Sequence, residues 1–342
     1  MFAATIFRGA LLSLAVGAAG CVPKGPARAD VAVPAVSPSP TPPPSAAVLA
    51  PATEEERALE GRLKETVEHL ARDIGDRNVA RSWNLASATD DLARTLEKMG
   101  YLVTRQGIVV GEDVVQNLEV ASGGGDKGNE IVFVAAHFDT ASGSPGADDD
   151  ASGVAAVVEL ARAFRDRKTK RTVRFSLLSN GEAPHVGTEH AGSLVFGKGM
   201  VQRGDQVVGG FCLDGLGVYR TEAKSEHPSA DALGLLPDVA DFVAAVGTEK
   251  GRAFYDAVLP SLKTATLPVV GVVVPEGSSL RTHGACAGFD ALGFPTVTVT
   301  DTGPFRYPHH HQKTDLPEEL DFGRLSRVVS ALGRALAAIA DS

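Results

Sequence analysis

Two apolar segments on either side of an amphipathic one constrain the fold of this chain more than any other feature. "EIVFVAAH" (130–137) and "TVRFSLLS" (172–179) are mainly apolar runs of strand length, whereas "SGVAAVVELARAFRD" (152–166) repeats its apolar residues at helical spacing. Strands that are apolar on both faces and are joined through a helix indicate a parallel sheet covered by helices on both sides. The sequence therefore predicts a three-layer α/β/α fold around a mostly parallel, mixed central sheet.

The rest of the chain continues this alternation of strands and helices. Further strands are expected at 101–106, 116–122, 207–214, 268–274 and 295–301, and further helices at 59–74, 92–99, 237–248, 250–261 and from Asp321 onward. Thr53 and Glu56 form a capping box ahead of the first of these helices. We therefore expect a single folded domain that spans residues 53–342.

The first 52 residues differ in character from the rest of the chain. Residues 1–21 contain one early Arg, an apolar run that is short for a bilayer span, and small residues before Cys21, as in a secretory signal. The end of this segment resembles a bacterial lipobox with Cys21 as the acylated residue, and ordinary signal cleavage is the alternative. Residues 22–52 are rich in Pro, Ala and Ser, which predicts a disordered tether. We expect an exported protein, periplasmic or at the cell surface, that a lipid anchor on Cys21 attaches to a membrane.

Charge and cysteine content exclude some partners and leave one question open. The formal net charge is −9, which argues against nucleic acid or an anionic membrane surface as the main partner. Besides Cys21, the chain contains Cys212 and Cys286. These two thiols could pair in an oxidising compartment, but they belong to different predicted elements, so the sequence leaves their pairing open.

Residues of the types that bind metals follow several predicted strands, at the sheet edge where α/β proteins bind ligands. They are His137, Asp139, Asp148, Asp149, Asp150, Glu182, Asp214, His309, His310, His311 and Asp315. Taken singly, each has a simpler interpretation, because aspartates cap helices and histidines are common in solvated loops. Their recurrence at the strand ends of one sheet, with an acidic cluster that needs a cation if it is buried, predicts a metal site.

Six segments of the chain, in order, resemble the co-catalytic di-zinc exopeptidases of metallopeptidase family twenty-eight. They are "GDRN", "HFDT", "GADDDASGVAAVVELAR", "GTEHAGS", "LDGLG" and "HQKTDLPEELDFGRL". The resemblance covers about residues 75–340, and the family includes aminopeptidase Y, bacterial leucyl aminopeptidases and glutaminyl cyclases. It implies the zinc-exopeptidase type of fold, two zinc ions and peptide substrates.

The resemblance also implies a role for each ligand. His137 and Asp214 would complete one zinc site, Glu182 and His311 the other, and Asp149 would bridge them. His311 is preferred over its neighbours because it lies four residues before Asp315, which is the family's spacing. Asp139 would accept the second ring N–H of His137 and fix its tautomer. Imidazole and carboxylate groups are suitable ligands for zinc.

Gly181 departs from the family pattern. The family carries two adjacent Glu residues here, a general base followed by a zinc ligand, and the ungapped match places Gly181 at the position of the base. His185, Glu189 or Asp148 could serve instead, but their spacing singles out none of them. A Glu at position 181 would then be expected to restore the base.

A second departure lies before the penultimate strand, where many relatives carry Ser-Asp-His. Here His283 comes early and Cys286 stands close to the position of the family's His. The resemblance therefore implies a zinc-dependent aminopeptidase that removes N-terminal residues from peptides with impaired turnover. The alternative is a catalytically inactive, zinc-binding pseudo-peptidase that binds peptides. A third possibility is a transferase of the glutaminyl cyclase type, which needs the same missing acid.

Overall fold

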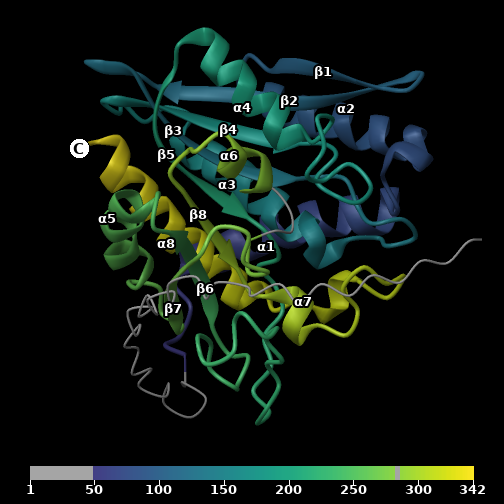
Figure 1. Cartoon of the computed structure of the whole chain (residues 1–342), viewed down its shortest axis with the longest axis vertical. Helices are drawn as coiled ribbons and strands as arrows, with labels where there is room; N and C mark the ends of the chain where they lie inside the picture. The colour runs from purple at the N-terminus through teal and green to yellow at the C-terminus, as the bar shows by residue number, and fades with distance from the viewer. Residues whose placement is uncertain (1–48, 282–285) are drawn as a thin grey trace, which may run out of the picture. The chain divides into compact units, whose positions relative to one another are not determined.

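The computed structural model describes residues 49–281 and 286–342, and all of these belong to one compact unit (Figure 1). The predictions about the signal segment, Cys21, most of the tether and His283 lie outside the described residues. Within the described ranges, no helix is both long and apolar enough to span a membrane.

Eight strands form one sheet in the order β1-β2-β4-β3-β5-β8-β6-β7. They are β1 (Thr104–Val110), β2 (Asp113–Gly123), β3 (Lys127–His137), β4 (Arg171–Leu178), β5 (Gln206–Leu213), β6 (Val243–Thr248), β7 (Val269–Val274) and β8 (Thr296–Thr300). Neighbours are parallel in β4-β3-β5-β8 and in β6-β7, and antiparallel in β1-β2, β2-β4 and β8-β6. The predicted mixed and mostly parallel sheet is confirmed.

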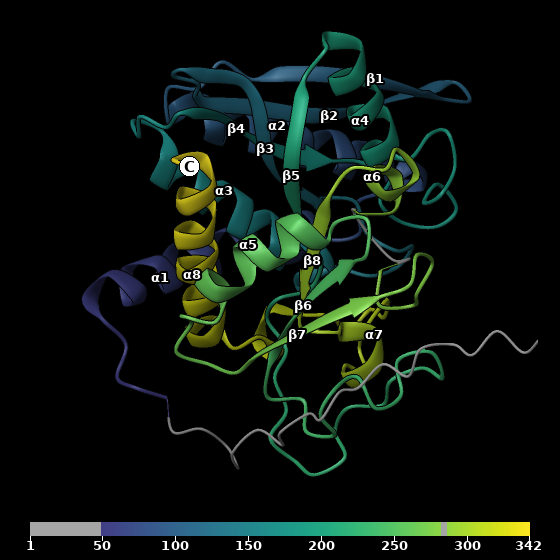
Figure 2. The same ribbon diagram turned by 60° about the vertical axis from the view of Figure 1, so that its left-hand side comes forward.

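Helices cover both faces of this sheet, as the two views show (Figures 1 and 2). They are α1 (Glu54–Glu68), α2 (Ser82–Lys98), α3 (Gly153–Phe164), α4 (Gly192–Arg203), α5 (Arg252–Leu262), α6 (Ala287–Ala291), α7 (Gly303–Arg306) and α8 (Phe322–Ala340). The capping box of Thr53 and Glu56 is present at the start of α1, and Asp321 caps α8. Three layers are therefore confirmed.

Alternate residues of the central strand β3 divide the core into two parts. Val132 and Val134 belong to the large cluster formed with α1, α2, α3, α5 and α8. Ile131 and Phe133 point to the opposite face, where they join Phe196 of α4 and other residues near α6. Because both faces of β3 are covered here, its residues 131–136 are apolar without interruption and buried.

The helix predicted at 237–248 is wrong, because residues Val243–Thr248 form β6. All six residues of this strand are buried, and they pair with β7 on one side and β8 on the other. A short apolar run that contains two Ala residues fits a buried helix or a buried strand equally well in the sequence, and here pairing within the sheet decides.

Helix α4 was not predicted, because its segment contains three Gly residues that weaken the helical signal. One of them, Gly197, has a packing function, since a Cβ atom there would lie 2.4 Å from Leu292 Cδ1.

Cys212 of β5 and Cys286, directly before α6, form a disulfide bond. The bond lies in the cluster between the sheet and helices α4 and α6. It answers the question of pairing that the sequence left open.

Candidate metal centre

The five expected metal ligands lie around the carboxyl ends of β3, β4 and β5. His137 is the last residue of β3, Asp214 directly follows β5, and Glu182 lies in the loop after β4. Asp149 comes from the turn that precedes α3, and His311 from the loop after α7. Because β4, β3 and β5 are parallel neighbours, these segments meet at one edge of the sheet.

Four of these five side chains, together with His310, form two groups that share Asp149, and Glu182 belongs to neither group. The ligand atoms of His137, Asp149 and Asp214 lie within 4.8 Å of one another, as do those of Asp149, His310 and His311. Asp149 Oδ1 is 3.3 Å from His137 Nε2, and Asp149 Oδ2 is 3.0 Å from His311 Nε2. One oxygen of Asp149 therefore faces each group, which is the arrangement of a carboxylate that bridges two metal ions.

The donor set of this centre fits zinc. Glu182 Oε1 is buried and accepts no hydrogen bond from the described residues, although His311 Nε2 lies 3.1 Å away. A buried carboxylate oxygen in this state is unfavourable unless a cation compensates it. Carboxylates and imidazoles that converge on one place in this way match the ligand chemistry of zinc.

The electrostatics of the metal-free site point to the same conclusion. Burial raises the pKa of Asp214 well above its usual range, and the charge of Asp149 adds to this effect. Burial also acts on Asp149, but hydrogen bonds with His137 and His311 hold the pKa of Asp149 well below its usual range. The neighbouring carboxylates of Asp149 and Glu182 raise the pKa of His311 to about 10. Without metal, protonated imidazole thus balances the carboxylates, and a divalent cation could replace those protons.

Asp139 organises the loop of Gly181 and Glu182 more than it orients His137. Its two carboxylate oxygens accept the backbone N–H groups of Gly181 at 2.8 Å and of Glu182 at 3.2 Å. The ring atom His137 Nδ1 lies closer to the backbone oxygen of Asp139, at 3.1 Å, than to its carboxylate, at 3.6 Å. The sequence led us to expect the carboxylate as the partner of this ring, and in the structure the carbonyl oxygen is the nearer of the two.

Gly181 packs directly against His137. A Cβ atom at position 181 would lie 2.4 Å from His137 Cγ and 2.5 Å from His137 Cβ, far inside van der Waals contact. The φ angle of Gly181 lies outside the left-handed region, whereas that of Asn180 is 57°. Glycine is therefore required here by the side chain of His137 and not by the backbone conformation.

The other residues considered as substitute bases lie in neither group. Asp148 Oδ1 accepts the backbone N–H of Gly217 at 2.9 Å, so this oxygen is engaged in holding the loop that contains Gly217. His185 and Glu189 lie in the loop after Glu182, and neither occurs in the two metal-ligand groups of the described residues. The structure therefore adds no support for any of these three.

Sequence reasoning missed His310 as a member of the second group. His310 Nδ1 lies 3.3 Å from Asp149 Oδ2, and its ring stacks on that of His311 with the centroids 3.9 Å apart. The spacing to Asp315 selected one histidine of three and gave no reason to keep a second. The signal was the run of three histidines itself.

Arg77 was also missed, although its segment "GDRN" was noted. Its side chain is fully buried and donates hydrogen bonds to the backbone oxygens of Phe138 at 2.6 Å, Pro145 at 2.6 Å and Gly146 at 3.0 Å. These carbonyls flank the loop that joins His137 to the acidic turn. Arg77 therefore fixes the loop on which Asp149 is carried.

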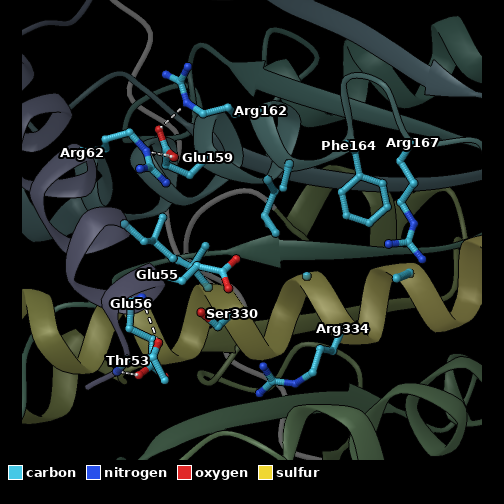
Figure 3. Close-up of a pocket in the computed structure, with 16 residues that line it drawn as sticks. Thr53, Glu55, Glu56, Arg62, Glu159, Arg162, Phe164, Arg167, Ser330 and Arg334 are labelled. Carbon is cyan, nitrogen blue, oxygen red and sulfur yellow. Dashed lines mark hydrogen bonds and ion pairs between the residues drawn. The ribbon is translucent and has the colours of Figure 1, made fainter. Parts of the chain in front are cut away.

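Two hollows of the surface differ in their relation to this centre. The larger, of about 620 Å³, lies between α1, α3 and α8, and no candidate ligand lines it (Figure 3). Its Glu159 is held between Arg62, at 2.6 Å, and Arg162, at 3.0 Å, so these charges are paired with one another. A much smaller hollow lies beside Asp214 and is lined by Ser279, Leu280, Thr300, Thr302, Pro304 and Phe305.

The chain is similar to known peptidases in sequence and in fold. Residues 117–335 match the sequence profile of peptidase family M28. The Escherichia coli (strain K12) protein YfbL is 25% identical over 288 residues, which cover 79% of this chain and 85% of YfbL.

Two solved structures share the fold. The zinc aminopeptidase BSAP from Bacillus subtilis has a TM-score of 0.64 at 12% identity, with 83% of this chain and 95% of that chain covered. The glutaminyl cyclase of Fimbriiglobus ruber has a TM-score of 0.59 at 19% identity, with 82% and 95% covered. The profile covers more than half of the sequence, and the site geometry agrees with it: the chain belongs to peptidase family M28.

Proposed function

We propose that this protein is a zinc-dependent aminopeptidase that hydrolyses N-terminal residues of peptides. The observation that carries the proposal is the pair of ligand groups that share Asp149, one oxygen facing each. Two bound zinc ions would act as Lewis acids that polarise the peptide carbonyl and lower the pKa of the attacking water. Membership of a peptidase family supports hydrolysis of peptides as the reaction.

The residues of the chain would divide the remaining tasks. His137, Asp149, Asp214, Glu182 and His311 hold the ions. The excess of carboxylates around the centre favours the positively charged amino terminus of a peptide over other chain ends.

The proposed site lacks a general base at the position where the family carries one. Position 181 has no side chain, so it cannot accept a proton from the attacking water. A positioned general base contributes about 10²–10⁴-fold to rate, and we infer that turnover is reduced by a factor in this range. The packing of His137 on Gly181 also favours a second candidate, a pseudo-peptidase that binds zinc and peptides without cleaving them.

We further propose that the protein is exported and remains attached to a membrane through a lipid on Cys21. The apolar segment that ends in small residues before Cys21 supports this location, and the Pro-rich stretch 22–52 supports a tether between anchor and domain. A tethered enzyme of this kind would act on peptides outside the cytoplasm.

Turnover and metal content measured on the same preparation test the proposal. The substrates are a panel of aminoacyl amides together with a glutaminyl peptide, and zinc-loaded protein is compared with its metal-stripped form. We expect two zinc equivalents and slow, zinc-dependent release of N-terminal residues. Two equivalents without any turnover would select the pseudo-peptidase. Cyclisation of the glutaminyl peptide alone would select the transferase, and absence of bound zinc would reject all three functions.

A further inference from the structure

The run His309–His311 presents its side chains in two directions. His310 Nδ1 lies 3.3 Å from Asp149 Oδ2, and His311 Nε2 lies 3.0 Å from the same oxygen. His309 instead directs its Nδ1 to Thr314 Oγ1, at 2.7 Å. Two of the three histidines therefore face the shared carboxylate, and the third faces its own loop.

The backbone explains how neighbouring residues can face the same side. Consecutive side chains of an extended chain point in opposite directions. Here the chain turns at His310 and His311, and φ of His311 is 59°, in the left-handed region that residues other than Gly rarely adopt. This turn brings the two neighbouring rings to the same side of the chain.

The distances between donor atoms suit ligands of a single ion. Zinc ligands at 2.0–2.1 Å in a tetrahedron lie about 3.3 Å from one another. Asp149 Oδ2 is 3.3 Å from His310 Nδ1 and 3.0 Å from His311 Nε2, and His311 Nε2 is 3.1 Å from Glu182 Oε1. His310 thus lies from Asp149 at the spacing expected of two ligands of one ion, within the group of Asp149, His310 and His311, and Glu182 adjoins this group through His311.

We propose that His310 is a ligand of the second zinc ion, together with Asp149, Glu182 and His311. The inference rests on the proposed zinc centre, and it gives the two zinc sites different numbers of protein ligands. The first group, His137, Asp149 and Asp214, offers three protein donors, which is the number found in zinc sites with an open position. The second would offer four, the number found in closed, structural zinc sites. The first site would then take the substrate, and the second would hold its ion permanently.

The variant His310→Ala tests this assignment, with His309→Ala as the matched control. Both proteins are loaded with two equivalents of zinc as full-length chains, and each equivalent is titrated against a competing chelator. We expect His310→Ala to weaken the second equivalent by more than about 100-fold, beyond the 10–100-fold effect of residues that only orient a ligand. The first equivalent should be retained in both variants, and His309→Ala should match the wild type. A loss of about 100-fold or less would overturn the proposal.

X-ray absorption at the zinc edge of the wild-type protein gives a readout that needs no variant to fold. We expect a total of three imidazole ligands on the two zinc ions, whereas a total of two would contradict a role for His310. The two proposals fail in distinguishable ways. A wild-type protein that binds no zinc refutes the metal centre as a whole. A wild-type protein that binds two ions, beside a His310→Ala variant that binds both with unchanged affinity, refutes only the assignment of His310.

Discussion

A side chain at position 181 should displace His137 and remove the first metal ion. The Cβ atom of Gly181→Ala would lie 2.4 Å from His137 Cγ, so the ring would have to move by about 1 Å to reach ordinary contact at 3.4 Å. Overpacking of this kind costs about 1–3 kcal/mol. His137 belongs to the first ligand group and not to the second. We therefore expect the variant to be less stable and to retain one zinc ion of two.

The same reasoning reverses the expectation that the sequence raised for Gly181→Glu. Its carboxylate would occupy the place of the family's base, but its Cβ atom meets the same obstacle as that of alanine. Both variants should lose the first zinc ion, and neither should gain turnover. Gly61→Ala in α1 is the control, because a Cβ atom there meets nothing within 4 Å, and it should stabilise the protein by about 0.5–1 kcal/mol.

Three measurements on these variants check the reasoning: metal analysis, thermal unfolding with and without added zinc, and turnover of aminoacyl amides. A stable Gly181→Ala protein with two zinc ions would show that His137 moves aside without cost, and the packing argument would be refuted. A Gly181→Glu protein that gains the 10²–10⁴-fold of a positioned base would show in addition that the missing carboxylate alone limits the enzyme.

Four further predictions follow from other parts of the molecule. Asp139→Asn should weaken zinc binding by about 10–100-fold in a chelator competition. The reason is that the amide can accept only one of the two backbone N–H bonds, from Gly181 and Glu182, that order the ligand loop. An unchanged zinc affinity would contradict the role of Asp139 in ordering this loop. The pKa of His311 is about 10 in the metal-free protein, so zinc binding at pH 8 should release protons, and zinc affinity should rise with pH up to about 10. Calorimetry in buffers of different ionisation enthalpy measures the number of protons released. Zinc binding without proton release would refute the assignment of His311 as a zinc ligand. Replacing Cys212 and Cys286 together by Ala should cost on the order of 4 kcal/mol in denaturant unfolding, since the bond closes a loop with a sequence separation of 74, and an unchanged midpoint would argue against the bond. Cys21→Ser should move the exported protein from the membrane to the soluble fraction, whereas a wild-type protein that is already soluble would favour ordinary signal cleavage.

The sequence predicts the sheet well where burial on both faces leaves a continuous apolar run, as in residues 131–136 of β3. It fails at β6, because a six-residue apolar stretch has no period that separates strand from helix, and only its neighbours β7 and β8 decide. Of the five ligands that the resemblance selected, the fold brings four into the two groups around Asp149, and zinc binding by all five stays a prediction. The resemblance could not reveal that His137 packs on Gly181, because the two residues come from different strand ends and their contact depends on the register of β3 against β4.

His310 and Arg77 escaped prediction for different reasons. A spacing rule chooses one histidine from a run, whereas the direction of each ring depends on the turn at His311. An arginine is ordinarily expected at the surface, and nothing in its immediate sequence shows that backbone carbonyls will surround it. Side-chain direction and the pairing of distant loops are thus the information that the linear pattern lacks.

Arg77 has a consequence for the way the protein matures. Burial lowers the pKa of its guanidinium to about 10, while Asp315, Asp139, Asp150 and Asp149 oppose this shift through their charges, so the group keeps its positive charge at physiological pH. The acidic loops therefore carry a cation of their own before any metal arrives. We therefore expect the scaffold to fold before its ions bind, and one metal to exchange for another without unfolding of the chain.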